Sequence, residues 1–361
     1  MTMKRFVSVL CVLLSLVLVL PLSGCSNEPK EITLLTWKDY VPEQILKDFT
    51  ESSGIKVTVV TAETNEDMLG MIEKDPSAYD LAIVADYAAD KLVQKKLLAE
   101  IDTKDMENYK YVSDGYKSKY YDPDNKYTVP YSTAGILLAY DKTKVPFEIT
   151  SFAQLLDPAL KNTTSYVDDA NAIAGIANMI LGESPDKSND TSNMIKIVKK
   201  MADSIYSADS DSPEEALASG EASVGVMFTS QLGYATAVNP NLEIVYPKEG
   251  FIYSIDVCVI PSGAKAPKNA GKLIDYMQDP MVNGKIMPEI NCSTTNTSAV
   301  QFMEDTYRNS KGYNIDPSKA GEGVLFRPLD EESQKKFNYI QKKYFKEYHA
   351  EQSSNADEPE E

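Results

Sequence analysis

The sequence has 361 residues and a formal net charge of −18, from 54 acidic and 36 basic side chains. This balance excludes a typical nucleic-acid-binding protein, because such a protein needs a basic surface to meet phosphates. The one histidine, His349, lies close to the end of the chain, so the usual general base of hydrolytic enzymes is missing from the rest of it. The length allows one large or two medium domains.

Residues 1–24 are predicted to be a signal peptide. Two basic residues precede an almost wholly apolar run over 6–20, which is too short for a membrane span. The segment 22–25 (LSGC) follows, and small residues before a cysteine resemble the bacterial lipobox, in which the thiol is lipidated and the chain is cut just before it. An ordinary signal peptide with an incidental cysteine is the alternative. We expect lipidation at Cys25, a tether over 25–30, and a protein held by its lipid on the outer face of the cell membrane.

Strands and helices are expected to alternate directly after the tether. The expected strands cover 31–35, 55–61 and 80–84, and the expected helices cover 42–53, 65–73 and 90–96. Such alternation predicts a parallel sheet with helices on both faces, in which ligands bind at the carboxyl ends of the strands. Trp37 and Tyr40 follow the first strand, and Asp86 and Tyr87 follow the third. These side chains therefore lie where a ligand is expected.

The later part of the chain continues with mixed elements. Strands are expected over 127–130, 134–140, 165–169, 223–228, 242–246 and 252–260. Helices are expected over 150–156, 170–181, 193–202, 231–238, 268–277, 280–286, 302–309 and 332–348. The acidic residues 349–361 are expected to form a disordered tail.

Three carboxylates stand out in this part of the chain. Asp168 and Asp169 precede a small-residue helix, where one of them can cap the helix and leave the other free to face a cleft. Asp256 lies in the middle of an apolar strand, where a carboxylate is costly unless it is paired. Such groups could also serve as the acid and base of a glycoside hydrolase, so a hydrolase remains a second class, and a sensor or adhesin ectodomain a third.

Cys258 and Cys292 are the cysteines that remain after the signal peptide and the lipid-bearing Cys25. An exported chain can form a disulfide, so both a bridge and two buried thiols stay open. Two cysteines and one histidine give no metal-binding spacing, and no nucleotide-binding motif is present. We expect no metal and no cofactor.

An ordered series of short segments resembles the spermidine/putrescine-binding proteins of bacterial ABC importers. The segments are 34–42 (LLTWKDYVP), 49–57 (FTESSGIKV), 78–81 (AYDL), 127–131 (YTVPY), 168–170 (DDA) and 245–250 (VYPKEG). The resemblance implies an α/β, two-lobed periplasmic-binding-protein fold of a type II-like kind, each lobe a mainly parallel sheet flanked by helices. By the same analogy, lobe 1 is 31–135 plus 257–302 and lobe 2 is 136–256 plus 303–348.

The resemblance also implies a ligand site. Aromatic side chains that stack along a polyamine correspond to Trp37, Tyr40, Tyr87 and Phe228, and carboxylates that take its ammonium groups correspond to Asp169 and Asp256. Arg327 falls where the family has a glutamine, Ala172 where it has a glutamate, and Ser254 where it has a tryptophan.

These departures leave two ligand classes open. One is a small cationic amine of the spermidine/putrescine class, and the other is a zwitterionic amine whose carboxylate meets Arg327 or Lys38. The resemblance implies a monomer without catalytic activity, which passes its ligand to a membrane permease and an ATPase.

Overall fold

The computed structural model describes residues 28–356, except 188, 189, 211, 317 and 320. The expected signal peptide and the lipidation of Cys25 therefore lie outside the described residues. Within the part that is described, no helix is both long and apolar enough to cross a membrane.

The alternating first part of the chain is confirmed. Its strands are β1 (Glu31–Thr36), β2 (Lys56–Thr61) and β3 (Leu81–Ala85), and its helices are α2 (Glu43–Ser53), α3 (Asn65–Lys74) and α4 (Asp86–Gln94). β1 pairs in parallel with β2 on one side and with β3 on the other. Leu34 belongs to one apolar cluster and its neighbour Leu35 to another, so both faces of the sheet are covered.

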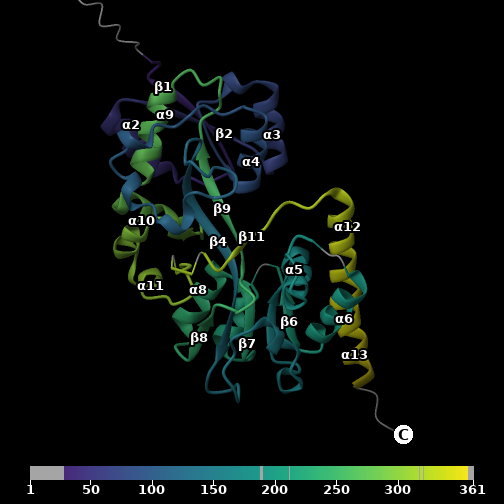
Figure 1. Cartoon of the computed structure of the whole chain (residues 1–361). Helices are drawn as coiled ribbons and strands as arrows, with labels where there is room; N and C mark the ends of the chain where they lie inside the picture. The colour runs from purple at the N-terminus through teal and green to yellow at the C-terminus, as the bar shows by residue number, and fades with distance from the viewer. Residues whose placement is uncertain (1–27, 188–189, 211, 317, 320, 357–361) are drawn as a thin grey trace, which may run out of the picture.

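Two long antiparallel strands form the middle of the molecule. β4 (Thr128–Asp141) and β9 (Ile252–Val259) pair along most of the length of β9 and run between an upper and a lower lobe (Figure 1). Two separate strands were expected over 127–130 and 134–140, and this is wrong because the chain continues through residues 131–133. The pairing of β4 with β9 shifts its register between Pro130 and Ser132, so the strand accommodates the proline and does not end there.

The lower lobe extends the same sheet, whose strand order is β2-β1-β3-β9-β4-β7-β5-β6. The strands added here are β5 (Thr164–Val167), β6 (Ile205–Asp209), β7 (Val224–Phe228) and β8 (Leu242–Val245). The helices around them are α5 (Ala170–Ile180), α6 (Thr191–Ala202), α7 (Glu214–Ser219) and α8 (Thr229–Val238). β6 was not expected from the sequence, because this edge strand buries only Ile205.

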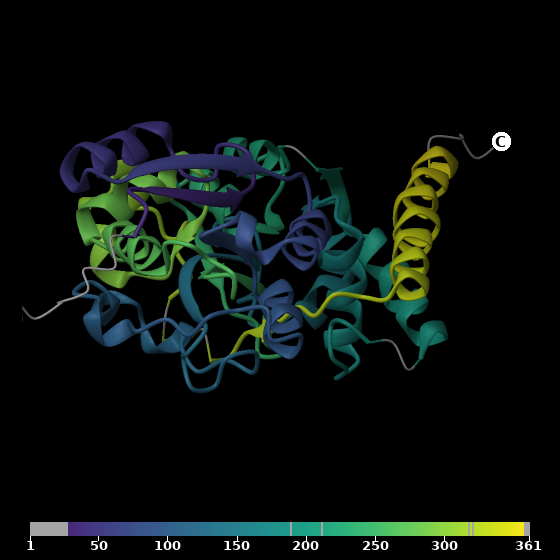
Figure 2. The same cartoon turned by 90° about the horizontal axis from the view of Figure 1, so that it is seen from above.

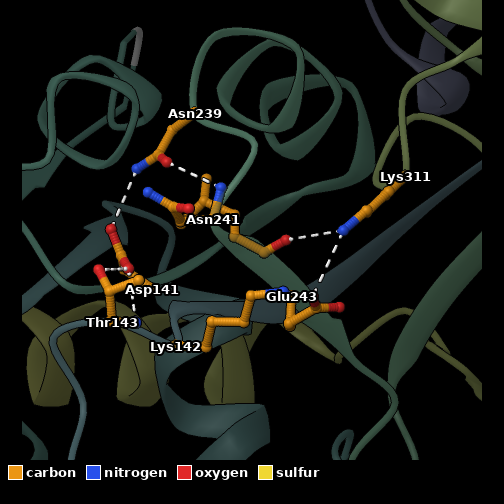
Figure 3. A network of polar contacts seen from close by, with 8 residues as sticks. Asp141, Lys142, Thr143, Asn239, Asn241, Glu243 and Lys311 are labelled. Atoms are coloured by element: carbon orange, nitrogen blue, oxygen red, sulfur yellow. Dashed lines mark hydrogen bonds and ion pairs between the residues drawn. The ribbon is translucent and has the colours of Figure 1, made fainter.

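A polar network fastens the lower end of β4 to its neighbours (Figure 3). Asn239 donates to Asp141 at 3.3 Å, and Glu243 of β8 bonds Lys142 at 2.7 Å and Lys311 at 3.4 Å. Lys311 therefore ties the segment that follows α11 (Asp305–Arg308) to the lower lobe.

The chain then crosses twice between the lobes. α9 (Pro267–Met277) and α10 (Pro280–Glu289) lie in the upper lobe, and the two-residue β10 (Ser293–Thr294) pairs with β4. β11 (Val324–Leu325) pairs with β9, and the chain passes from it to α12 (Glu331–Ile340) beside α5 and α6 (Figures 1 and 2). A helix was expected over 302–309, but the α-helix in this region, α11, covers only Asp305–Arg308. A separate 3-10 segment, Thr297–Phe302, precedes it.

The C-terminal helix is longer than expected. A π-helical segment, Gln341–Glu347, follows α12 and leads into α13 (Tyr348–Ala356). The prediction of a disordered tail from residue 349 is therefore wrong for residues 349–356, which are helical. They continue a helical segment that packs on the lower lobe, where Phe345 is fully buried and its ring meets that of Tyr166 edge to face at 5.1 Å. Residues 357–361 lie outside the described residues.

Candidate functional site

Trp37 and Tyr40 lie together at the carboxyl end of β1. Asp39 adopts a left-handed φ of 57° between them, and the two rings meet edge to face with centroids 4.9 Å apart. Trp37 is partly exposed while its ring packs against both apolar clusters. The turn after β1 therefore presents an indole and a phenol at the carboxyl ends of the parallel strands, the edge at which α/β sheets generally bind ligands.

Asp256 is held by hydroxyl groups at the same place. The Tyr40 hydroxyl donates to Asp256 Oδ2, and the Ser132 hydroxyl donates to the same oxygen at 3.2 Å. Burial raises the pKa of Asp256, and the two hydroxyl bonds partly oppose that rise. Among the residues described, no lysine or arginine forms an ion pair with Asp256. The carboxylate that the sequence predicted to need a partner therefore has neutral donors and, among the described residues, no cationic partner.

Asp86 is a fully buried carboxylate close to the partly buried Asp256. Ala85 pairs with Asp256 across β3 and β9, and Asp86 follows directly as the first residue of α4. Its Oδ1 accepts from the Tyr87 amide at 2.7 Å, while its fully buried Oδ2 has no hydrogen-bond partner. Burial, with a contribution from the charge of Asp256, raises the pKa of Asp86 to about 7. The sequence placed Asp86 at the right edge but not among the ligand residues, since burial of this carboxylate depends on β9, far away in the chain.

Tyr87 faces α3 rather than the Trp37–Tyr40 pair. Its hydroxyl donates to Glu66 at 3.2 Å, and Lys91 lies 5.4 Å from the ring centroid. In the part of the chain that is described, no ring contact joins Tyr87 to Trp37 or Tyr40. The structure therefore places this candidate at the expected edge, but not within one aromatic cluster.

Asp169 and Phe228 belong to the opposite lobe. Asp169 comes two residues after β5 and Phe228 is the last residue of β7, and these strands are parallel neighbours, so both residues lie at one edge of the sheet. Asp169 Oδ1 caps α5 by accepting from the Ala172 amide at 2.7 Å. Phe228 is partly exposed, and its amide donates to Gln231 at 3.1 Å. The structure brings these two residues to a common edge, but not into contact with Trp37 or Asp256.

Asp168 is not free to face a cleft. The Gln341 amide donates to its Oδ1, and Lys346 pairs with its Oδ2 at 2.5 Å. Both members of the acidic pair thus have structural partners, although Asp169 Oδ2 accepts no bond from any described residue.

Arg327 stands apart from the other candidates. Its guanidinium stacks on the Tyr120 ring at 4.6 Å, and it lines a cavity of about 510 Å³ with Lys119, Lys187 and Tyr253. Lys38 is exposed beside Trp37.

The two late cysteines are free thiols. Cys258 is buried, and Cys292 is partly exposed with its sulfur 3.5 Å from the Tyr40 hydroxyl. Burial and the charge of Asp256 raise the pKa of Cys292 to about 11. The bridge that the sequence left open is not formed. No cluster of histidine, cysteine and acidic side chains suited to a metal occurs among the described residues.

Comparison with known proteins gives a consistent result. A family model described as "Bacterial extracellular solute-binding protein" matches residues 44–314. The spermidine/putrescine-binding periplasmic protein of Salmonella typhimurium is 30% identical over 311 residues, covering 85% of this chain and 89% of that protein.

Two solved structures share the fold. A substrate-binding protein of a spermidine/putrescine ABC transporter from Streptococcus pneumoniae has a TM-score of 0.71 at 24% identity, with 88% and 99% of the two chains covered. A putative spermidine/putrescine ABC transporter from Listeria monocytogenes has a TM-score of 0.65 at 26% identity, with 87% and 98% covered.

Proposed function

We propose that this chain, which belongs to the bacterial extracellular solute-binding proteins, binds a polyamine of the spermidine/putrescine class for an ABC importer. Membership in this family makes it a transport protein that binds solutes, and not an enzyme. The ligand class is supported by relatives that are named as spermidine/putrescine-binding or putrescine/cadaverine-binding proteins. The observation that carries the proposal is Asp256, a partly buried carboxylate beside an indole and a phenol, with two hydroxyl donors and no cation among the described residues.

The side chains of Asp256, Trp37 and Tyr40 together suit an organic ammonium group. The negative charge of Asp256 would be paired in a site of low polarity, and the faces of Trp37 and Tyr40 attract cations and cover methylene groups. The hydroxyls of Tyr40 and Ser132 keep Asp256 in place before the ligand arrives. A second ammonium group would meet Asp169 at the facing edge, with Tyr87 and Phe228 beside the carbon chain.

Binding across two edges implies closure of the lobes. We infer that lobe 1 comprises 31–135 plus 257–302 and lobe 2 comprises 136–256 plus 303–348, with β4 and β9 as the connection that bends. A ligand that touches both lobes favours the closed form. The closed form, a monomer anchored by the lipid on Cys25 outside the cytoplasm, would dock on the permease and its ATPase.

Isothermal titration calorimetry with putrescine and spermidine tests this function. We expect both amines to bind the wild-type protein without turnover. Asp256→Asn should weaken binding by roughly 30-fold or more, because truncating one member of a buried charge pair costs about 2–5 kcal/mol. Asp124→Asn is the matched control, since it removes the same charge from an exposed turn. Undiminished affinity of Asp256→Asn would refute the site, and no heat with either amine would refute the ligand class.

A further inference from the structure

The cavity beside Arg327 gathers positive charge in a strongly acidic protein. Its walls come from residues 118–120, 184–187 and 321–327 and from Tyr253 of β9, and it measures about 510 Å³. Three of its lining side chains are cations, Lys119, Lys187 and Arg327, and one is an acid, Asp186. The whole chain carries −18, so a local excess of cations is unusual for its surface.

None of these three cations is neutralised by the described part of the protein. Across the described residues, neither Lys119, Lys187 nor Arg327 forms an ion pair, whereas eleven ion pairs occur elsewhere. The Asp186 carboxylate accepts instead from the Ser184 hydroxyl. Like charges held together repel each other, so a free anion that joins them would gain a favourable interaction.

Two of the cations are positioned by aromatic side chains. Lys119 Nζ donates to the Tyr253 hydroxyl at 3.0 Å, and two of its three donors remain available. Burial lowers the pKa of Lys119, while the charge of Asp86 opposes that change. The Arg327 guanidinium lies over the exposed Tyr120 ring, 4.6 Å from its centroid, and forms no ion pair with any described residue, so its donors are available for a bidentate pair. Lys187 is exposed at the same cavity.

We propose that this cavity binds a small oxyanion, a carboxylate or a phosphate, through Arg327, Lys119 and Lys187. Arg327 would take two oxygens in one plane, and the two lysines would pair with the remaining charge. This site does not depend on the amine-binding function, because a polyamine carries only positive charge and would be repelled here. A single solute with both an ammonium and a carboxylate group, or two separate solutes, could satisfy the two sites.

Calorimetry on the full-length protein with sodium succinate and inorganic phosphate, at constant ionic strength, tests the proposal. We expect at least one of the two anions to bind, and the one that binds identifies the carboxylate or phosphate source. Arg327→Gln and Lys187→Gln should each weaken that binding by roughly tenfold.

Lys161→Gln is the matched control, since Lys161 is an exposed lysine outside the cavity, and it should bind the anion as the wild type does. Because Lys187 is also exposed, its replacement leaves the fold intact, and circular dichroism checks this for each variant. The proposal is overturned if neither anion produces heat, or if the Arg327 and Lys187 variants bind as tightly as Lys161→Gln.

Discussion

Asp86→Asn should change how the stability of the protein depends on pH. The wild-type carboxylate is fully buried with one unpaired oxygen, and the amide that replaces it keeps the bond from the Tyr87 amide without carrying charge. Asp86 has a pKa of about 7 in the folded protein against 3.8 as the ordinary value. The native state therefore binds more protons than the unfolded state between these values, and the wild-type protein loses stability as the pH rises through that window.

The size of the effect follows from the two pKa values. Ionisation of Asp86 lowers the free energy of unfolding by about 2 kcal/mol at pH 5 and about 4 kcal/mol at pH 8, with the protonated form as reference. The side-chain amide of the variant cannot ionise, so the variant escapes both losses. The free energy of unfolding of Asp86→Asn, relative to wild type, should therefore rise by about 2–3 kcal/mol between pH 5 and pH 8.

Urea unfolding at the two pH values, followed by circular dichroism, measures this difference. Asp124→Asn is the control, because its carboxylate is exposed and its replacement should shift stability equally at both pH values. If Asp86→Asn and wild type differ by the same amount at pH 5 and pH 8, Asp86 does not carry a buried charge and the reasoning fails.

Three further predictions concern the cleft and the C-terminal helix. Trp37 is the only tryptophan in the sequence, so its fluorescence should change when an amine binds, and an unchanged signal with an amine that binds by calorimetry would place Trp37 away from the ligand. Amine affinity should fall as the pH is lowered, because burial raises the pKa of Asp256 and only its ionised form pairs with an ammonium group. Tyr40→Phe should weaken binding by about tenfold at neutral pH and move the fall to higher pH, since a hydrogen bond to a charged group contributes about 1.5–3 kcal/mol. A flat calorimetric profile across pH would contradict this. Lys346→Met should lower the free energy of unfolding by about 0.5–1 kcal/mol, since it loses a half-exposed ion pair with Asp168; an unchanged urea midpoint would show that this pair does not stabilise the helix.

Local patterns predicted the elements whose partners lie nearby in the chain. The strands and helices up to α4 were found because both faces of β1 and β3 are buried, which requires continuous apolar runs. The position of Trp37 and Tyr40 followed from the same alternation. Asp256 was identified because a charged carboxylate between apolar neighbours costs free energy unless it has a partner.

Features that depend on distant partners were missed. β6 is polar because it pairs on one side only, so its sequence does not alternate like a half-buried strand. The C-terminal helix continues to Ala356 in contact with α6, although its sequence is acidic and polar there. One of Asp168 and Asp169 was expected to be free to face a cleft, but both have structural partners, and Lys346, which pairs with Asp168, is 178 residues away in the chain. Burial of Asp86 depends in the same way on its approach to β9.

The register shift in β4 has a mechanical consequence for the cleft. Ser132 stands immediately after the shift and opposite Asp256, so the hydroxyl that bonds this carboxylate lies next to an irregularity of the strand that joins the lobes. Rotation of one lobe against the other about β4 would swing that hydroxyl toward or away from the carboxylate. If the lobes rotate in this way, the charge environment of Asp256 would change with the angle between them, and a cation bound to Asp256 would in turn favour one angle.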